Sequence, residues 1–193
     1  MGALLAVVAG LVLAVARPGS GGASASLVGD HANGGGLPPE RRDAILRGAR
    51  EDGVDPATVV AAATAGPEGA AVAALVGTGF DGRVRVSFFH GFGMTAFQPP
   101  GHLFARGEQL ALSEGYSGPQ HEPVRVVVVG AARPTVSRVE IELADGRTVD
   151  AALNRRAGFG FFAYVGASPT EFPTFVRAFA GGVLVQTHEI PKL

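Results

Sequence analysis

The chain contains no cysteine, and this absence excludes several kinds of structure and chemistry. Without thiols there is no disulfide framework, no thiolate nucleophile and no cysteine-ligated zinc or iron–sulfur centre. Export is still compatible with the sequence, because a domain of about 150 residues can be held together by its hydrophobic core alone. The compartment in which the protein works must therefore be inferred from other features.

Positive charge is sparse and almost entirely of one type. Lys192 is the only lysine, the arginines occur singly or in pairs, and the net charge is −1. Proteins that bind nucleic acids need clustered cations, because much of their affinity comes from release of the counterions around the phosphates. We therefore expect no nucleic-acid partner. With 47% hydrophobic and 17% charged residues, the 193-residue chain has the composition of one folded domain plus an additional segment.

A long run without polar side chains lies at the N-terminus. From Ala3 to Ala16 every residue is Ala, Val, Leu or Gly. A helix of this length would measure about 21 Å, which is shorter than the ~30 Å hydrocarbon layer of a membrane and fits the apolar region of a signal peptide. We interpret residues 1–16 as a signal peptide or a signal-anchor helix. A buried core helix is the alternative.

The segment that follows has the composition of a flexible linker. Residues 17–37 are dominated by Gly, Ser and Ala, which bury too little apolar surface to offset the conformational entropy lost on folding. Small residues suited to signal cleavage end at Ala16 and at Ala25. A hydrophobic segment followed by a linker is typical of a domain held at a membrane surface. We therefore expect an exported protein that is either membrane-tethered or extracellular.

A short helix is expected to open the folded part, at about residues 39–52. Pro38 and Pro39 suit the first helical turn, and Glu40 suits the positive end of the helix dipole. Gly53 is well placed to end the helix. The apolar stripe of this helix is narrow, and we interpret the arginines on its other side as a solvated face.

After Asp55 the hydrophobic pattern changes from helical to alternating or continuous, with turn signals at short intervals. The predicted strands are residues 58–64, 70–76, 83–89, 109–113, 123–131, 136–143, 147–153, 159–165, 175–180 and 183–187. The first of these could instead be a short helix, but its β-branched residues favour a strand. Many short strands joined by tight turns predict a mainly β domain, an antiparallel β-sandwich over residues 38–193.

Two parts of this sandwich can be placed in more detail. In RVEIELADGRTVDAAL, a three-residue turn that ends at Gly146 pairs Ile141 with Val149 and keeps one face of the hairpin apolar. A two-residue turn would instead place Ile141 opposite Asp150. Within residues 124–129, four consecutive valines make both faces of the strand apolar, which predicts a central strand that is covered on each side.

The sequence GTGFDG at residues 77–82 matches the glycine pattern of dinucleotide-binding proteins, G-x-G-x-x-G. That pattern binds a pyrophosphate only where a helix follows, because the ligand lies at the N-terminus of the helix. The residues that follow, Arg83 to Phe88, alternate as in a strand. We therefore interpret residues 77–82 as a hairpin loop, and we expect no nucleotide and no cofactor.

The histidines raise the question of a metal site. His90, His102, His121 and His188 lack the spacing that puts two ligands on one face of an element, although distant strands could bring them together. Histidines that form ordinary hydrogen bonds at strand ends and in loops are the favoured interpretation. We predict no catalytic residue and no metal ligand, and a His-dependent metallohydrolase remains an alternative.

The sequence HGFGMTAFQPPGHLF, residues 90–104, is the longest departure from the strand pattern. Its candidate partner-binding residues are His90, Phe92, Met94, Phe97, His102 and Phe104. Loops that expose apolar residues on a sandwich often bind partners. In the other interpretation the phenylalanines fold back and close one end of the sandwich. The second interpretation is favoured, because exposed phenylalanines lower solubility.

The stretches RVEIELADGRTVDAAL, GFFAYV and FVRAFAGGVLV, within residues 124–187, resemble uncharacterised exported or membrane-tethered proteins of actinobacteria. Those proteins have an N-terminal hydrophobic segment, a linker and an immunoglobulin-like β-domain. The resemblance implies an immunoglobulin-like sandwich and a location outside the cytoplasm, and it implies no catalytic residue.

Taken together, these features predict a noncatalytic interaction or structural module at the cell envelope. Its partners would be the membrane, through the N-terminal segment where this is uncleaved, and an unknown protein or glycan. An extracellular sensor or regulatory domain of a membrane-anchored protein is the leading alternative.

Overall fold

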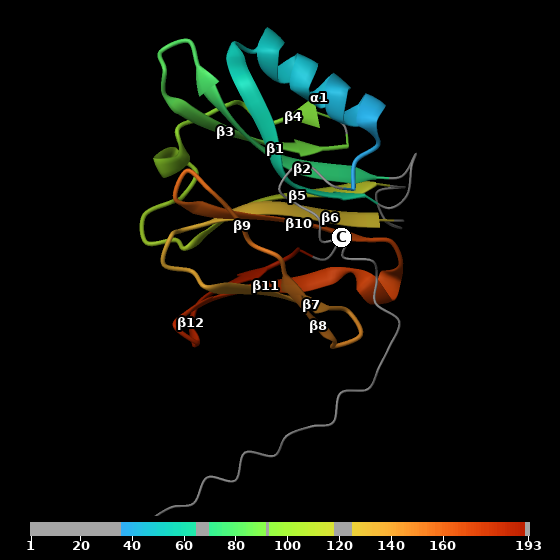
Figure 1. Cartoon of the computed structure of the whole chain (residues 1–193). Helices are drawn as coiled ribbons and strands as arrows, with labels where there is room; N and C mark the ends of the chain where they lie inside the picture. The colour runs from blue at the N-terminus through green and yellow to red at the C-terminus, as the bar shows by residue number, and fades with distance from the viewer. Residues whose placement is uncertain (1–35, 65–69, 92, 118–124, 192–193) are drawn as a thin grey trace, which may run out of the picture.

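The structure, a computed structural model, describes residues 36–64, 70–91, 93–117 and 125–191. These residues are mainly β, with one α-helix and three antiparallel sheets of four strands each. From top to bottom in Figure 1, helix α1 (Pro39–Glu51) and an upper, a middle and a lower sheet form four layers. Among these residues no helix is both long and apolar enough to cross a membrane. The predicted N-terminal hydrophobic helix and most of the predicted linker lie outside the described residues.

Each sheet has its own spatial order of strands. In the upper sheet the order is β1 (Val54–Thr64), β2 (Ala71–Gly79), β3 (Val84–His90) and β4 (Gly93–Met94). In the middle sheet it is β5 (Leu110–Ser117), β6 (Arg125–Ala132), β10 (Phe159–Gly166) and β9 (Asn154–Arg156). In the lower sheet it is β12 (Val183–Glu189), β11 (Pro173–Ala180), β7 (Arg138–Leu143) and β8 (Thr148–Ala151). Two single 3₁₀ turns, η1 (Pro100–His102) and η2 (Pro169–Glu171), precede β5 and β11.

Three hydrophobic clusters hold these four layers together. The cluster between the middle and lower sheets includes Phe162 and Ile141, and the cluster between the upper and middle sheets includes Phe161 and Val86. A third cluster joins α1 to the upper sheet and includes Ile45. Because successive side chains of a strand point to opposite faces, neighbouring residues of the middle sheet fill two different cores. The middle sheet is therefore buried on both sides, as predicted for the strand at residues 124–129.

Several local predictions are confirmed. Helix α1 occupies Pro39–Glu51, and β1 shows that residues 58–64 form a strand and not a helix. In the β7–β8 hairpin Ile141 pairs with Val149, and Gly146 has a φ of +82°, the left-handed conformation that favours glycine. The glycine motif at residues 77–82 ends β2 and begins the turn into β3, so it is a hairpin.

The structure also differs from the prediction in several respects, among them the start of β1 at Val54 and not at residue 58. β4 and β9 contain two and three residues, too few to produce a recognisable alternation in the sequence. β5 extends to Ser117, beyond the predicted end at residue 113. The arrangement is consistent with the predicted β-sandwich, but it stacks three sheets where a simple sandwich has two. The alternation of apolar residues indicates which strand faces are buried, and it does not indicate how many sheets stack.

Candidate functional site

The candidate binding segment, residues 90–104, lies along the upper sheet and leads from β3 towards β5. The backbone of Gln98 exchanges two hydrogen bonds with Val86, with N–O distances of 2.8 and 3.0 Å. Ser87, whose side chain is completely buried, donates its hydroxyl hydrogen to the carbonyl oxygen of Thr95 at 2.5 Å. The backbone N–H of Phe88 donates to the hydroxyl of Thr95. The middle of the segment is therefore held against β3.

Two apolar side chains of this segment pack beneath α1. Met94 and Phe97 are both half-buried and belong to the cluster that joins the helix to the upper sheet. The methyl group of Met94 would lie only 2.9 Å from a Cβ atom placed on Gly48 of α1. The close fit between these two residues places Met94 in the interface between the helix and the sheet.

Phe104 lies in a different core, between the upper and middle sheets. It is 7% exposed, and its ring stacks on that of Phe159 with 5.6 Å between the ring centroids. The guanidinium group of Arg133 lies 4.6 Å from the centroid of the same ring, a cation–π contact. Phe104 is therefore enclosed by an aromatic ring and a cation.

The remaining candidate residues of the segment lie apart from Met94, Phe97 and Phe104. His102 is exposed on η1, His90 is half-buried at the end of β3, and Phe92 lies outside the described residues. The described apolar members of the segment thus contribute to two separate cores and do not form one surface. This placement favours the interpretation in which the segment closes the fold. Its role in binding a partner stays a prediction.

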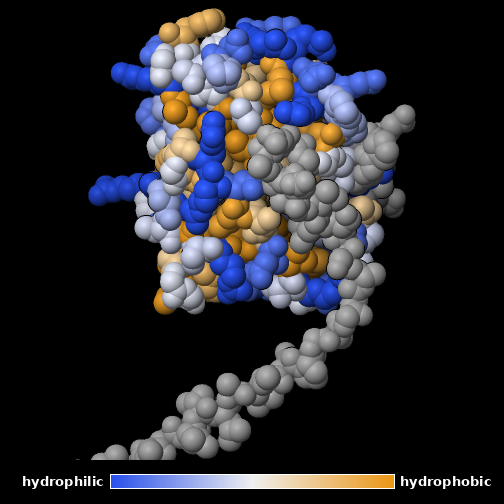
Figure 2. Space-filling model, in the orientation of Figure 1, coloured by the Kyte–Doolittle hydropathy of each residue, from blue (hydrophilic) through white to orange (hydrophobic). Residues whose placement is uncertain are grey.

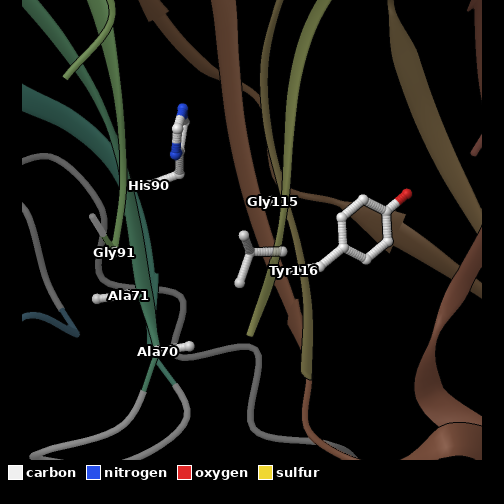
Figure 3. A pocket seen from close by; sticks show the side chains of 7 residues that line it. Ala70, Ala71, His90, Gly91, Gly115 and Tyr116 are labelled. Carbon is white, nitrogen blue, oxygen red and sulfur yellow. The ribbon is translucent and has the colours of Figure 1, made fainter. Parts of the chain in front are cut away.

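A small hollow lies between the upper and middle sheets next to His90. Its volume is about 20 Å³. The lining consists of Ala70, Ala71, His90, Gly91, Gly115, Tyr116 and Val127. Figure 3 shows the rings of His90 and Tyr116 on opposite sides of the strand that carries Gly115, and neither ring points towards the other. Ligand sites are commonly 300–1,000 Å³ with a few polar groups that converge, so this hollow does not have the form of an active site.

One set of polar side chains that the structure brings together connects the edge strands β5 and β12. His188 Nε2 lies 2.7 Å from Glu114 Oε1. Gln186 Oε1 accepts the backbone N–H of Gln109 at 2.5 Å and that of Leu110 at 2.9 Å. We call this set the β5–β12 seam.

The hydroxyl of Tyr116 adds a further contact to the seam by donating to the carbonyl oxygen of Pro191 at 2.9 Å. The seam fastens the middle sheet to the lower sheet along one side. It was not predicted from the sequence, because polar side chains at alternating positions, such as Gln186 and His188, normally indicate a face of a strand that meets solvent.

The histidines do not assemble a metal site in the part of the chain that the structure describes. No group of three His, Asp or Glu side chains there is close enough to hold a metal ion. His90, His102 and His188 lie on three different elements, and His188 is paired with Glu114. His121 lies outside the described residues.

The shifted pKa values have structural causes. Burial raises the pKa of Tyr164 to about 12, and its hydroxyl donates to the carbonyl oxygen of Glu171 at 2.9 Å. The pKa of Asp81 is lowered, chiefly because its carboxylate accepts the backbone N–H of Arg83. The pKa of Asp145 is lowered in the same way by Arg147. Both aspartates stabilise hairpin turns.

Comparison with known proteins assigns neither a family nor a function to the chain. No family model matches the chain, and no curated protein and no solved structure matches it. The functional interpretation therefore depends on the sequence and on the geometry of the described residues.

Proposed function

We propose that the protein is an exported or membrane-tethered β-sandwich that serves as a noncatalytic interaction or structural module at the cell envelope. The observation that carries this proposal is the use of its polar side chains. His188, Glu114 and Gln186, which have the chemistry for acid–base or polar catalysis, are engaged in joining two sheets along the β5–β12 seam. Tyr164 likewise secures the turn before β11. These side chains therefore have a structural role, which is to hold the sheets and turns of the domain together.

We further propose that Leu110–Glu189 is an immunoglobulin-like sandwich. If β5 to β12 are named A, B, C, C′, D, E, F and G in chain order, the middle sheet has the order A-B-E-D and the lower sheet G-F-C-C′. The immunoglobulin fold places A, B, E and D in one sheet and C, F and G in the other. The upper sheet and α1 are then an addition that covers the outer face of the A-B-E-D sheet. This correspondence supports the resemblance inferred from the sequence.

The proposed location rests on the first 37 residues. Helix α1 begins directly after the predicted linker, so the folded domain would follow the hydrophobic segment with only residues 17–37 between them. A flexible chain of this length has an average end-to-end distance of about 25 Å. The domain would therefore stay close to the membrane wherever the hydrophobic segment is retained.

Fractionation of cells that produce the full chain tests the location. We expect the protein outside the cytoplasm, either intact in the membrane fraction or beginning at Arg17 or Ser26 after cleavage, as read by mass spectrometry of the N-terminus. The matched control is Leu11→Arg, which places a charge in the apolar run and should retain the protein in the cytoplasm. An intact parent chain found in the soluble cytoplasmic fraction would contradict the proposal.

A further inference from the structure

Four arginines that are far apart in the sequence meet at one end of the middle sheet. The guanidinium group of Arg133, which directly follows β6, lies over the ring of Phe104, and this ring stacks on Phe159. Arg156 of β9 is the residue opposite Phe159 in the pairing of β9 with β10. Arg106 comes two residues after Phe104. Three arginines are therefore placed around one pair of stacked rings.

The fourth arginine, Arg155, joins this group through the backbone. Its guanidinium group donates to the carbonyl oxygens of Pro134 and Val136, in the segment that follows Arg133. In Figure 1 the chain between η1 and β5 and the turn after β9 lie to the left of the middle sheet, and in Figure 2 strongly hydrophilic side chains project from this side. We call the four arginines together the basic end: Arg106, Arg133, Arg155 and Arg156.

The charge of the basic end is not neutralised. In the part of the chain that the structure describes, no carboxylate forms an ion pair with any of its four arginines. Glu108, the acidic residue closest in sequence to Arg106, uses its carboxylate to accept the backbone N–H of Ala105. Arginines elsewhere do have carboxylate partners, among them Arg85, Arg138, Arg147 and Arg177. The basic end therefore keeps a positive charge that can attract an anion.

The guanidinium group of Arg133 is already fixed in position. Its Nε donates to the carbonyl oxygen of Glu108 at 2.5 Å, and its contact with the ring of Phe104 holds the plane of the group. Its other two nitrogens are not buried and make no hydrogen bond within the described residues. A guanidinium group with free N–H groups presents a planar fork that matches a phosphate. Because this fork is ordered in advance, little conformational entropy would be lost on binding.

We propose that the basic end binds the phosphate groups of anionic phospholipids, so that this end of the tethered domain docks on the membrane surface. The inference rests on the proposed tethering and adds the contact that the tethered domain makes. Arginines close to an anionic membrane each strengthen binding, and several of them together hold a protein at the surface.

The position of the tether allows this end to face the membrane. The described chain begins at Gly36, beside Ala62 of β1. This part of β1 lies near the start of β6, because Ala71, which pairs with Thr64, and Val127 line the same hollow. The basic end lies at the other end of β6, about 26 Å away for eight residues of strand. The proposed linker has a similar average reach of about 25 Å.

The distribution of charge favours a flat anionic surface as the partner. The net charge of the whole chain is −1, so the part outside the basic end is negatively charged. An anionic membrane attracts the basic end and repels the remainder, which orients the domain. A long nucleic acid that followed the protein surface would instead meet the repelling part.

The absence of tryptophan provides the test, since any tryptophan introduced is the only one in the chain. Ala105→Trp places this probe at an exposed position beside Arg106. The full chain is reconstituted through its N-terminal segment into vesicles of phosphatidylcholine, with or without phosphatidylglycerol, that carry a nitroxide quencher on a lipid headgroup. We expect the tryptophan to be quenched on the anionic vesicles and not on the neutral ones. High salt should reduce the quenching, because it screens the attraction.

Arg106→Gln combined with Arg156→Gln should lower the ratio of docked to undocked domain about thirtyfold, because each arginine near an anionic surface contributes about fivefold. Both side chains are exposed and unpaired within the described residues, so the fold should be unchanged. The matched control, Arg47→Gln combined with Arg125→Gln, removes the same charge from α1 and from the start of β6. It should leave the ratio nearly unchanged.

Equal quenching on neutral and anionic vesicles would overturn the proposal. So would an equal loss in the control variant, because only the net charge would then matter. Capture of polyphosphate by the chain in detergent, without docking on anionic vesicles, would overturn it in favour of a soluble polyanion. Flotation with neutral vesicles reports the tethering separately. If the chain does not float with them, the proposed location fails, and flotation with anionic vesicles then tests the basic end by itself.

Discussion

Tyr164 illustrates how single polar residues are used in this protein. Its ring lies in the cluster between the middle and lower sheets and is 3% exposed, while its hydroxyl reaches the carbonyl oxygen of Glu171. The hydrogen bond satisfies a polar atom that would be costly to bury alone. Burial also disfavours the charged phenolate, which is why the pKa rises to about 12.

This pKa predicts a loss of stability in alkali. The unfolded chain releases the proton of Tyr164 near its ordinary pKa of 10.0, whereas the folded chain holds it to about 12. Between these values the folded state binds more protons, so the free energy of unfolding falls as the pH rises. Tyr164→Phe should flatten this fall, measured by urea unfolding at several pH values. With one lysine and no cysteine, few other groups titrate in this range. Equal slopes for the variant and the parent would contradict the assignment.

At the scale of elements, the segment at residues 90–104 shows a loop with few strand signals that is nevertheless part of the core. Its backbone follows β3, and its apolar side chains enter two hydrophobic clusters. Its glycines and prolines interrupt the alternation of apolar and polar residues that marks a strand. The sequence therefore predicted only an irregular loop that is rich in aromatic residues. Which way those residues point depends on packing with α1 and β10, which are distant in the sequence.

Phe104→Ala tests the structural role of this segment. Because the ring is enclosed by Phe159 and Arg133, its removal should lower the free energy of unfolding by about 3–5 kcal/mol. His102→Ala, two residues earlier and exposed, is the matched control and should change it by no more than about 0.5 kcal/mol. Both values come from chemical denaturation. Similar effects of the two substitutions would show that Phe104 is not a core residue.

At the scale of the whole molecule, β6 lies between the two hydrophobic cores on either side of the middle sheet. Val128 and Val129 are both completely buried, but Val128 belongs to the core shared with the lower sheet and Val129 to the core shared with the upper sheet. A single strand therefore supplies side chains to both cores. We expect the two cores to unfold together, because neither can lose its packing without exposing the middle sheet.

Val128→Ala and Val129→Ala test this coupling. Each should destabilise the protein by about 1.5–3 kcal/mol through lost burial and the cavity left behind. Both should shift the midpoint of one common transition, followed by circular dichroism and by calorimetry. If one substitution moved an early transition and the other a later one, the two cores would be independent units.

Much of the fold was readable from local signals. The extent of α1 followed from its prolines and Gly53, and the register of the β7–β8 hairpin followed from Gly146 and the alternation of Val139, Ile141 and Val149. These features depend on residues a few positions apart, where backbone preferences and the two-residue period of a strand act directly. The covered position of β6 followed in the same way from its continuous apolar run.

Spatial packing was needed for the rest. The stacking of three sheets, the enclosure of Phe104 and the gathering of four arginines at one end left no local pattern in the chain. The β5–β12 seam joins Gln109 to Gln186 across 77 positions and Glu114 to His188 across 74. A local pattern can show that a residue faces inward or is polar. The residue that it meets is set by how separate strands pack, because such contacts form only when the layers have assembled.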